Sequence, residues 1–169
     1  TIKEVYHLDL GVEEYEKSLE RLACHRIPAV PHIVLGLHFG KFIGEWDALN
    51  IIERYPRKAV VLVILQPLYG TAMALSLPPP VDEIGEFFSL CRHRLPDSPL
   101  FLGCARPLGP VKADIDRLAV DVGLDGIAYP AEGIVAYAEE RGRMPQFHNA
   151  CCGVGWESDM PSKSESKGA

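Results

Sequence analysis

Three short segments, each directly after an apolar run, hold the side chains of this chain that are best suited to bind a small molecule. They read GLHFGKFIGE (36–45), QPLYGT (66–71) and GCARPLG (103–109). In the first segment, Gly36 and Gly40 would let the backbone approach a ligand closely, and Glu45 stands where the next helix begins. The segment contains neither GxxxxGK(S/T) nor GxGxxG, and a plain turn between a strand and a helix is the alternative.

The second segment offers polar side chains to a ligand. Pro67 lacks an N–H donor and fixes the direction of the chain as the preceding strand ends. Gln66 and Thr71, on either side of it, could then form hydrogen bonds with a polar ligand. The alternative is a long loop that its own turn residues stabilise.

Arg106, followed by Pro107, makes the third segment the most informative. A guanidinium can hold a carboxylate through two parallel hydrogen bonds. We therefore expect Arg106 to face the ligand cavity and to pair with an anionic group there, or with a neighbouring acid such as Glu45 when the site is empty. Cys104 could be a nucleophile or a metal ligand, but the sequence fixes no His and carboxylate partner beside it. We expect Cys104 to be a small buried residue.

A possible metal site lies near the C-terminal end, where His148, Cys151 and Cys152 come close together in sequence. Zinc and iron–sulfur clusters accept such ligands. Adjacent cysteines, however, have poor geometry for one tetrahedral ion, and no fourth ligand is evident. We expect no metal here, with Cys151 and Cys152 as the exception to test. His32 stands alone in its apolar run and is expected to be a hydrogen-bonded structural residue.

The elements that must position these residues are four apolar runs, each followed by an amphipathic helix. The runs cover residues 29–36, 59–66, 100–104 and 126–130, and helices are expected over 12–26, 44–55, 114–122 and 134–141, with another after Pro80. Parallel neighbours need a helical crossover, so this alternation predicts an α/β fold with a parallel sheet. Ligands bind such sheets at the carboxyl ends of the strands, where all three segments lie.

Composition excludes several classes of function. The chain has 169 residues, a net charge of -6 and a sequence pI near 5.5, which argues against nucleic acid as the main partner. No apolar run approaches the roughly 20 residues that span a bilayer. Five scattered cysteines and no visible secretion signal fit a reducing cytoplasm. The chain begins at Thr1 in a helical stretch, and four strands would leave two apolar edges, so we expect a missing N-terminal part.

The four strand ends together resemble one family. The segments PHIVLGLHFGKFIGE, VILQPLYGT, LGCARPLGP and LDGIAYPAE, in this order, resemble the C-terminal half of radical S-adenosylmethionine (radical SAM) enzymes. The similarity is to their biotin synthase-related group, which includes archaeal-type two-component lipoyl synthases. It covers about residues 1–153 and implies a partial (β/α)8 TIM-type barrel of about four parallel strands with alternating helices. Residues 154–169 are polar and expected to be a disordered tail.

The resemblance also implies a chemistry. In that family a 4Fe-4S cluster, held by Cys-x3-Cys-x2-Cys after the first strand, binds S-adenosylmethionine and cleaves it to a radical that abstracts hydrogen from unactivated carbon. In lipoyl and biotin synthesis, sulfur then replaces the abstracted hydrogen. The implied partner is an acylated carrier protein or a second synthase subunit. By this resemblance, the cofactor-binding positions include Ile33, Gly36, Gln66, Pro67, Gly70, Thr71, Arg106 and Pro107. The glycine-rich segment described above adds Gly40 and Glu45 to these candidates.

The chain departs from the family in one respect: it contains no Cys-x3-Cys-x2-Cys. The cluster ligands are therefore absent, and this part alone is not expected to perform the chemistry. Two other interpretations stay open. One is a non-catalytic α/β binding or assembly domain, and the other is part of an ordinary aldolase- or phosphate-type barrel.

Overall fold

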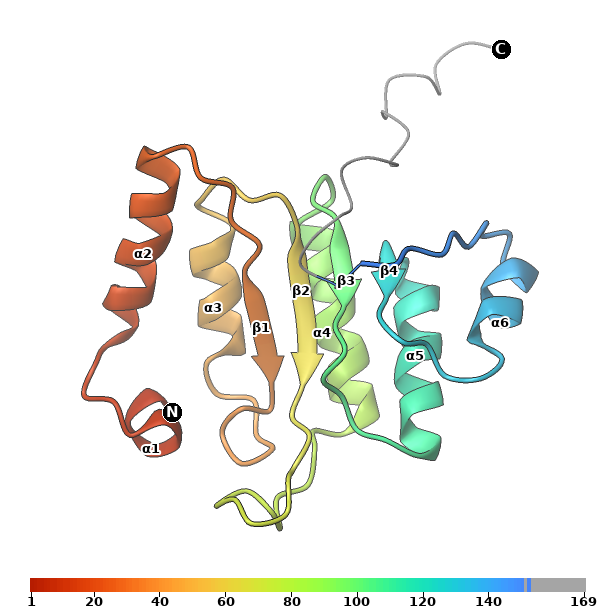
Figure 1. Cartoon of the computed structure of the whole chain (residues 1–169), viewed down its shortest axis with the longest axis horizontal. Coiled ribbons are helices and arrows are strands. Elements are labelled where there is room, and N and C mark those ends of the chain that lie inside the picture. Colours follow the sequence, from red (N-terminus) through yellow and green to blue (C-terminus); the bar gives the residue numbers. More distant parts are fainter. Residues whose placement is uncertain (151, 153–169) are drawn as a thin grey trace.

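The four expected strands form one all-parallel sheet in the order β1-β2-β3-β4 (Figure 1). A computed structural model of the chain describes residues 1–150 and 152. The strands are β1 (His32–Leu35), β2 (Val60–Ile64), β3 (Leu100–Leu102) and β4 (Gly126–Ile127). They are shorter than the apolar runs. β1 begins after Pro31, which has no N–H for the ladder, and ends before Gly36, whose positive φ of 74° turns the chain.

Helices alternate with the strands as the sequence predicts. They are α1 (Ile2–Tyr6), α2 (Val12–Cys24), α3 (Glu45–Ile52), α4 (Val81–Arg94), α5 (Pro110–Val122) and α6 (Ile134–Glu140). The start of α5 lies four residues before the expected position, because Pro110 occupies the first turn, where its missing N–H costs nothing. Gly123 ends α5 in the left-handed conformation and is its C-terminal cap.

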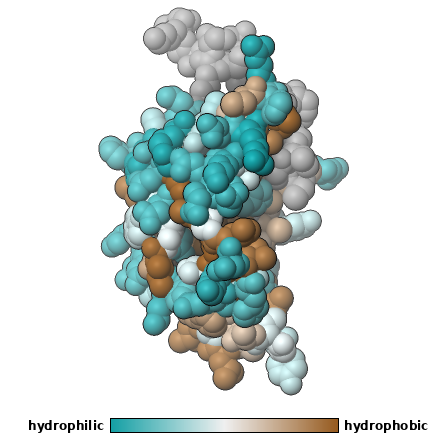
Figure 2. Space-filling view, turned by 90° about the vertical axis from the view of Figure 1, so that its left-hand side faces the viewer, coloured by the Kyte–Doolittle hydropathy of each residue, from teal (hydrophilic) through white to brown (hydrophobic). Residues whose placement is uncertain are grey.

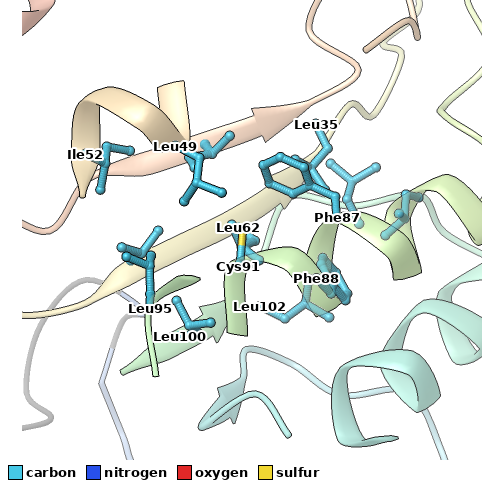
Figure 3. Close-up of a cluster of buried hydrophobic side chains, with 14 of the residues drawn as sticks. Leu35, Leu49, Ile52, Leu62, Phe87, Phe88, Cys91, Leu95, Leu100 and Leu102 are labelled. Carbon is cyan, nitrogen blue, oxygen red and sulfur yellow. The ribbon is translucent and has the colours of Figure 1, made fainter. Parts of the chain in front are cut away.

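One face of the sheet packs against α3, α4 and α5, which Figure 1 shows together behind the strands. The parallel register aligns Ile33, Leu62 and Leu102 in one row on this face. Figure 3 shows how Leu49, Phe87, Phe88 and Cys91 from the helices meet Leu35, Leu62 and Leu102 from the strands. Burial raises the pKa of the Cys91 thiol to about 12, so Cys91 behaves as a small apolar core residue.

The apolar spacing within residues 44–55 predicts that Trp46 faces inward together with Leu49 and Ile52. In the structure Trp46 is 42% exposed. Trp46 lies in the first turn of α3, at the carboxyl edge of the sheet. There its ring packs edge-on against Phe87, with centroids 5.0 Å apart, and beside Phe42, with centroids 6.0 Å apart. The stripe that reaches the core begins one turn later, at Leu49.

The opposite face of the sheet is also apolar, but no helix of residues 1–150 covers it. Its buried side chains are Val61, Val63 and Phe101 from the strands, with Ala59 and Cys152 beside them. All helices that pack on the sheet therefore lie on one side. None of the helices described by the structure is long and apolar enough to cross a membrane.

Candidate functional site

The loops that follow the four strands lie together at the carboxyl edge of the sheet, as expected for parallel strands (Figure 1). They connect β1 to α3, β2 to α4, β3 to α5 and β4 to α6. Of the ten candidate cofactor-binding positions, all but one lie in these loops or, for Glu45, at the first residue of α3. The exception is Ile33. Its side chain is buried on the helix-covered face, because it shares a row with Leu62 and Leu102. The cofactor-binding role that the resemblance implies for Ile33 stays a prediction.

Glu45 organises the loop between β1 and α3. Its carboxylate is only 5% exposed and accepts three backbone hydrogen bonds. Oε1 accepts from the Gly36 N–H at 2.8 Å, and Oε2 accepts from the N–H groups of Ile43 at 2.8 Å and Gly44 at 3.0 Å. The carboxylate thus fixes the backbone of the loop, and a ligand at this edge would meet the loop that Glu45 shapes.

Replacing Glu45 by Gln tests this role. The amide keeps one acceptor oxygen and places an NH2 group against a backbone N–H donor, so a buried donor loses its partner. We expect the free energy of unfolding to fall by about 1.5–3 kcal/mol, the range for hydrogen bonds to charged groups. Asp47→Asn, an exposed change in the same helix turn, is the control and should cost less than about 1 kcal/mol. Equal urea midpoints for both variants would contradict the assignment.

Gly36 and Gly40 serve contacts within the chain. Both have positive φ, at 74° and 86°. A Cβ on Gly36 would overlap the ring of Pro79, and a Cβ on Gly40 would overlap the carbonyl oxygen of Leu77. The close backbone approach that these glycines allow is therefore to the loop between β2 and α4, which lies across the same edge.

Arg106 does pair with a carboxylate through two hydrogen bonds, but that carboxylate is Asp116 of α5 and not Glu45. Nε donates to Oδ1 at 2.7 Å and Nη2 donates to Oδ2 at 3.1 Å. Arg106 is 1% exposed and Asp116 is 0% exposed. The expectation that Arg106 faces a ligand cavity is wrong in this structure, because its guanidinium is enclosed by its own chain.

The Arg106–Asp116 pair ties two loops and a helix together. Arg106 Nη1 donates to the Gly103 carbonyl at 2.6 Å, and Nη2 donates to the Tyr129 carbonyl at 3.0 Å. Asp116 Oδ2 also accepts from the Ala131 N–H at 2.7 Å. Sequence reasoning missed Asp116. The available signal was an acidic residue on the inward stripe of α5, beside Ile115 and Ala119.

In the loop between β2 and α4, the Thr71 hydroxyl forms its hydrogen bond within the loop itself. Thr71 Oγ1 donates to the Leu68 carbonyl at 2.8 Å, and Gly70 adopts a positive φ of 82° in open space. These two residues form a turn, as the alternative predicted, while Gln66 and Pro67 are half-buried at the strand end. The large side chains that this loop exposes are mostly apolar: Leu68, Tyr69, Leu75 and Leu77. Figure 2 shows apolar surface at the lower end of the molecule, where this loop lies in Figure 1.

Cys104 is exposed, so the expectation of a buried residue is wrong. The reason is the residue before it. A Cβ on Gly103 would overlap Val63, so Gly103 takes the position against the sheet and Cys104 is turned outward. Pro107, after Arg106, is buried.

The remaining candidates lie elsewhere. His32 Nδ1 is 3.0 Å from the Val30 carbonyl oxygen, in keeping with its expected structural role. Cys152 is buried on the helix-free face of the sheet, and Cys151 lies outside the described residues. Within residues 1–150 and 152, no three His, Cys, Asp or Glu side chains are grouped so that they could hold a metal ion.

The carboxyl edge thus combines a rigid framework with an apolar, partly aromatic surface. Glu45, Arg106 and Asp116 are buried within the framework, whereas Leu68, Tyr69, Leu108 and Tyr129 are exposed. Comparisons with protein-family models, with curated proteins and with solved structures returned no match for this chain. Chemically, this edge offers backbone groups and flat or apolar side chains to a ligand.

Proposed function

We propose that this chain forms the second half of a (β/α)8-type barrel, in a radical SAM enzyme that inserts sulfur at unactivated C–H bonds in the manner of lipoyl or biotin synthases. The observation that carries the barrel is the one-sided placement of the helices. Doubly wound sheets have helices on both faces, whereas barrel strands have helices outside and branched apolar side chains inside. Here α3, α4 and α5 share one face, and Val61, Val63 and Phe101 fill the other.

The free edge of β1 supports the same proposal. Among the described strands, β1 pairs with β2 alone. Between this edge and α2 lies a groove of about 450 Å³, lined mainly by apolar residues that include Tyr15, Leu19 and Leu22 of α2. In a barrel, a further parallel strand would occupy this groove, and α2 would be the crossover helix that leads from that strand into β1.

The proposed radical SAM chemistry rests on the resemblance of the four strand-end segments to that family. The fold brings these segments to one edge of the sheet. The described residues do not fit a 4Fe-4S cluster, because Cys24, Cys91 and Cys104 lie on different elements and only Cys104 is exposed at the carboxyl edge. The cluster would belong to the other half of the barrel. This half would contribute the loops after β1 and β2 and the exposed side chain of Tyr129 to the binding of S-adenosylmethionine. An acylated carrier protein or a second synthase subunit would supply the substrate.

A non-catalytic binding or assembly domain is the second candidate. The observation in its favour is that the charged groups of the edge, Glu45 and Arg106, are engaged within the chain, while the exposed groups are mostly apolar. A surface of this kind also suits docking to another protein. The two candidates differ in what precedes residue 1.

The coding sequence upstream of residue 1, together with anaerobic reconstitution, tests the proposal. We expect four further strand–helix units with Cys-x3-Cys-x2-Cys after the first strand. Iron and sulfide should give no stable cluster absorbance with the 169-residue chain, but a stable one with the extended polypeptide. A start codon directly before the codon of Thr1 would refute the proposal and favour the assembly domain. A full cluster on the short chain that is lost in a Cys151/Cys152 double variant would refute the assignment of the cluster to the other half.

A further inference from the structure

Tyr129 has a backbone conformation that its sequence position disfavours twice. Its φ is 49°, in the left-handed region that side chains other than glycine rarely adopt. It also precedes Pro130, whose ring pushes the preceding residue toward extended conformations. A segment with these residues would not turn this way on its own, so the surrounding structure must hold it.

Charged side chains hold the turn on both sides. The Tyr129 carbonyl oxygen accepts hydrogen bonds from Arg106 Nη2 at 3.0 Å and from Lys112 Nζ at 2.6 Å. After Pro130, the Ala131 N–H donates to Asp116 Oδ2 at 2.7 Å. Because Arg106 and Asp116 are themselves locked together and almost fully buried, the conformation of Tyr129 is set by the most enclosed polar group of the described chain.

The side chain of Tyr129 itself packs little against the rest of the protein. It is 79% exposed at the carboxyl end of β4. The other non-glycine residues with positive φ have local reasons. His7 and Arg26 follow helices, where a left-handed residue ends the helix. Phe39 and Gly40 are the central residues of a tight turn that the Lys41 N–H closes by donating to the His38 carbonyl at 3.0 Å. A strained backbone conformation that the surrounding structure holds in place is typical of binding and active sites, because it fixes a side chain in the position that a ligand contacts.

We infer that Tyr129 is a ligand-contacting residue, held by the Arg106–Asp116 pair so that its ring stacks on a flat heteroaromatic ring bound at the carboxyl edge. Resting on the proposed function, the ligand class is a purine nucleoside, with S-adenosylmethionine as its member. Lys112, whose ammonium lies at the Tyr129 carbonyl, adds a positive charge that favours an anionic group elsewhere on the same ligand.

Calorimetric titration of this chain with adenosine, S-adenosylmethionine and methionine tests the inference. Adenosine and S-adenosylmethionine should bind, and methionine, which has no ring, should not. Tyr129→Ala should weaken both ring ligands by about fivefold or more, the lower end for one base stacked on an aromatic side chain. Tyr129→Phe should bind like the unchanged chain. The control is Phe147→Ala, which removes an equally exposed aromatic ring away from this edge.

A stability measurement separates a ligand-contacting role from a structural one. Glycine adopts positive φ freely, so Tyr129→Gly should raise Tm while it abolishes ring binding. A fall in Tm with Tyr129→Gly, unchanged affinity in Tyr129→Ala, or no binding of adenosine by the unchanged chain would each overturn the inference. The proposed function fails separately: an upstream sequence without the cysteine triad would refute it and leave ring binding by Tyr129 intact.

Discussion

Replacing Asp116 by Ala is expected to lower the free energy of unfolding by about 3–5 kcal/mol, the cost of breaking a buried ion pair from one side. The guanidinium of Arg106 would stay buried without its carboxylate, and the Ala131 N–H would lose its acceptor. The loops after β3 and β4 share this group, so both should loosen. Urea unfolding gives the free energy, and amide hydrogen exchange at residues 129–131 reports the loosening.

Two further variants make the interpretation specific. Asp114→Ala, on the same helix, removes an exposed partner of Arg117 and should cost less than about 1 kcal/mol. The double variant Arg106→Met, Asp116→Leu should cost less than either single change, because no charge stays buried alone. If Asp116→Ala proved as mild as Asp114→Ala, the pair would not be holding these loops together.

The second large effect is expected from Gly40→Ala. Alanine at Gly40 must adopt a left-handed backbone, at about 1–2 kcal/mol, and its Cβ would also overlap the Leu77 carbonyl oxygen. A backbone oxygen cannot move aside like the end of a side chain, so we expect an additional steric cost of about 1–3 kcal/mol.

Gly70→Ala is the matched control for Gly40→Ala. Gly70 has nearly the same φ, 82°, but a Cβ there has no neighbouring atom within 4 Å. The difference between the two unfolding free energies therefore isolates the contact between the loops after β1 and β2. Equal destabilisation in both variants would show that these loops move apart easily and do not form one rigid edge.

The sequence predicts the elements of this fold well, since their signals are local. The run Ala59–Leu65 is apolar at every position and contains β2, which is buried along its whole length. Gly123 marks the end of α5 and Gly142 follows α6, because glycine accepts the left-handed backbone that a helix end requires. The observed element boundaries differ from the predicted ones at two prolines. Pro31 has no N–H for the strand ladder, so β1 begins after it, and Pro110 fits the first turn of a helix, so α5 begins there.

The site is predicted less well, since its contacts join residues far apart in the chain. Arg106 was recognised as a residue that pairs with a carboxylate, but ten positions separate it from Asp116, and only the fold shows that they meet. Gly36 and Gly40 were recognised as points of close approach, but the approaching group is residues 77–79. Because Arg106 is buried against Asp116, Arg106→Lys is expected to lower the stability of the fold rather than to weaken ligand binding directly.

The most direct measurement of the central claim is the anaerobic formation of 5′-deoxyadenosine from S-adenosylmethionine by this polypeptide extended through its upstream coding region. With a reconstituted cluster and a strong reductant, the extended polypeptide should release 5′-deoxyadenosine, and Tyr129→Ala should reduce its affinity for S-adenosylmethionine. A folded, cluster-loaded extended polypeptide that forms no 5′-deoxyadenosine would contradict the assignment to the radical SAM enzymes.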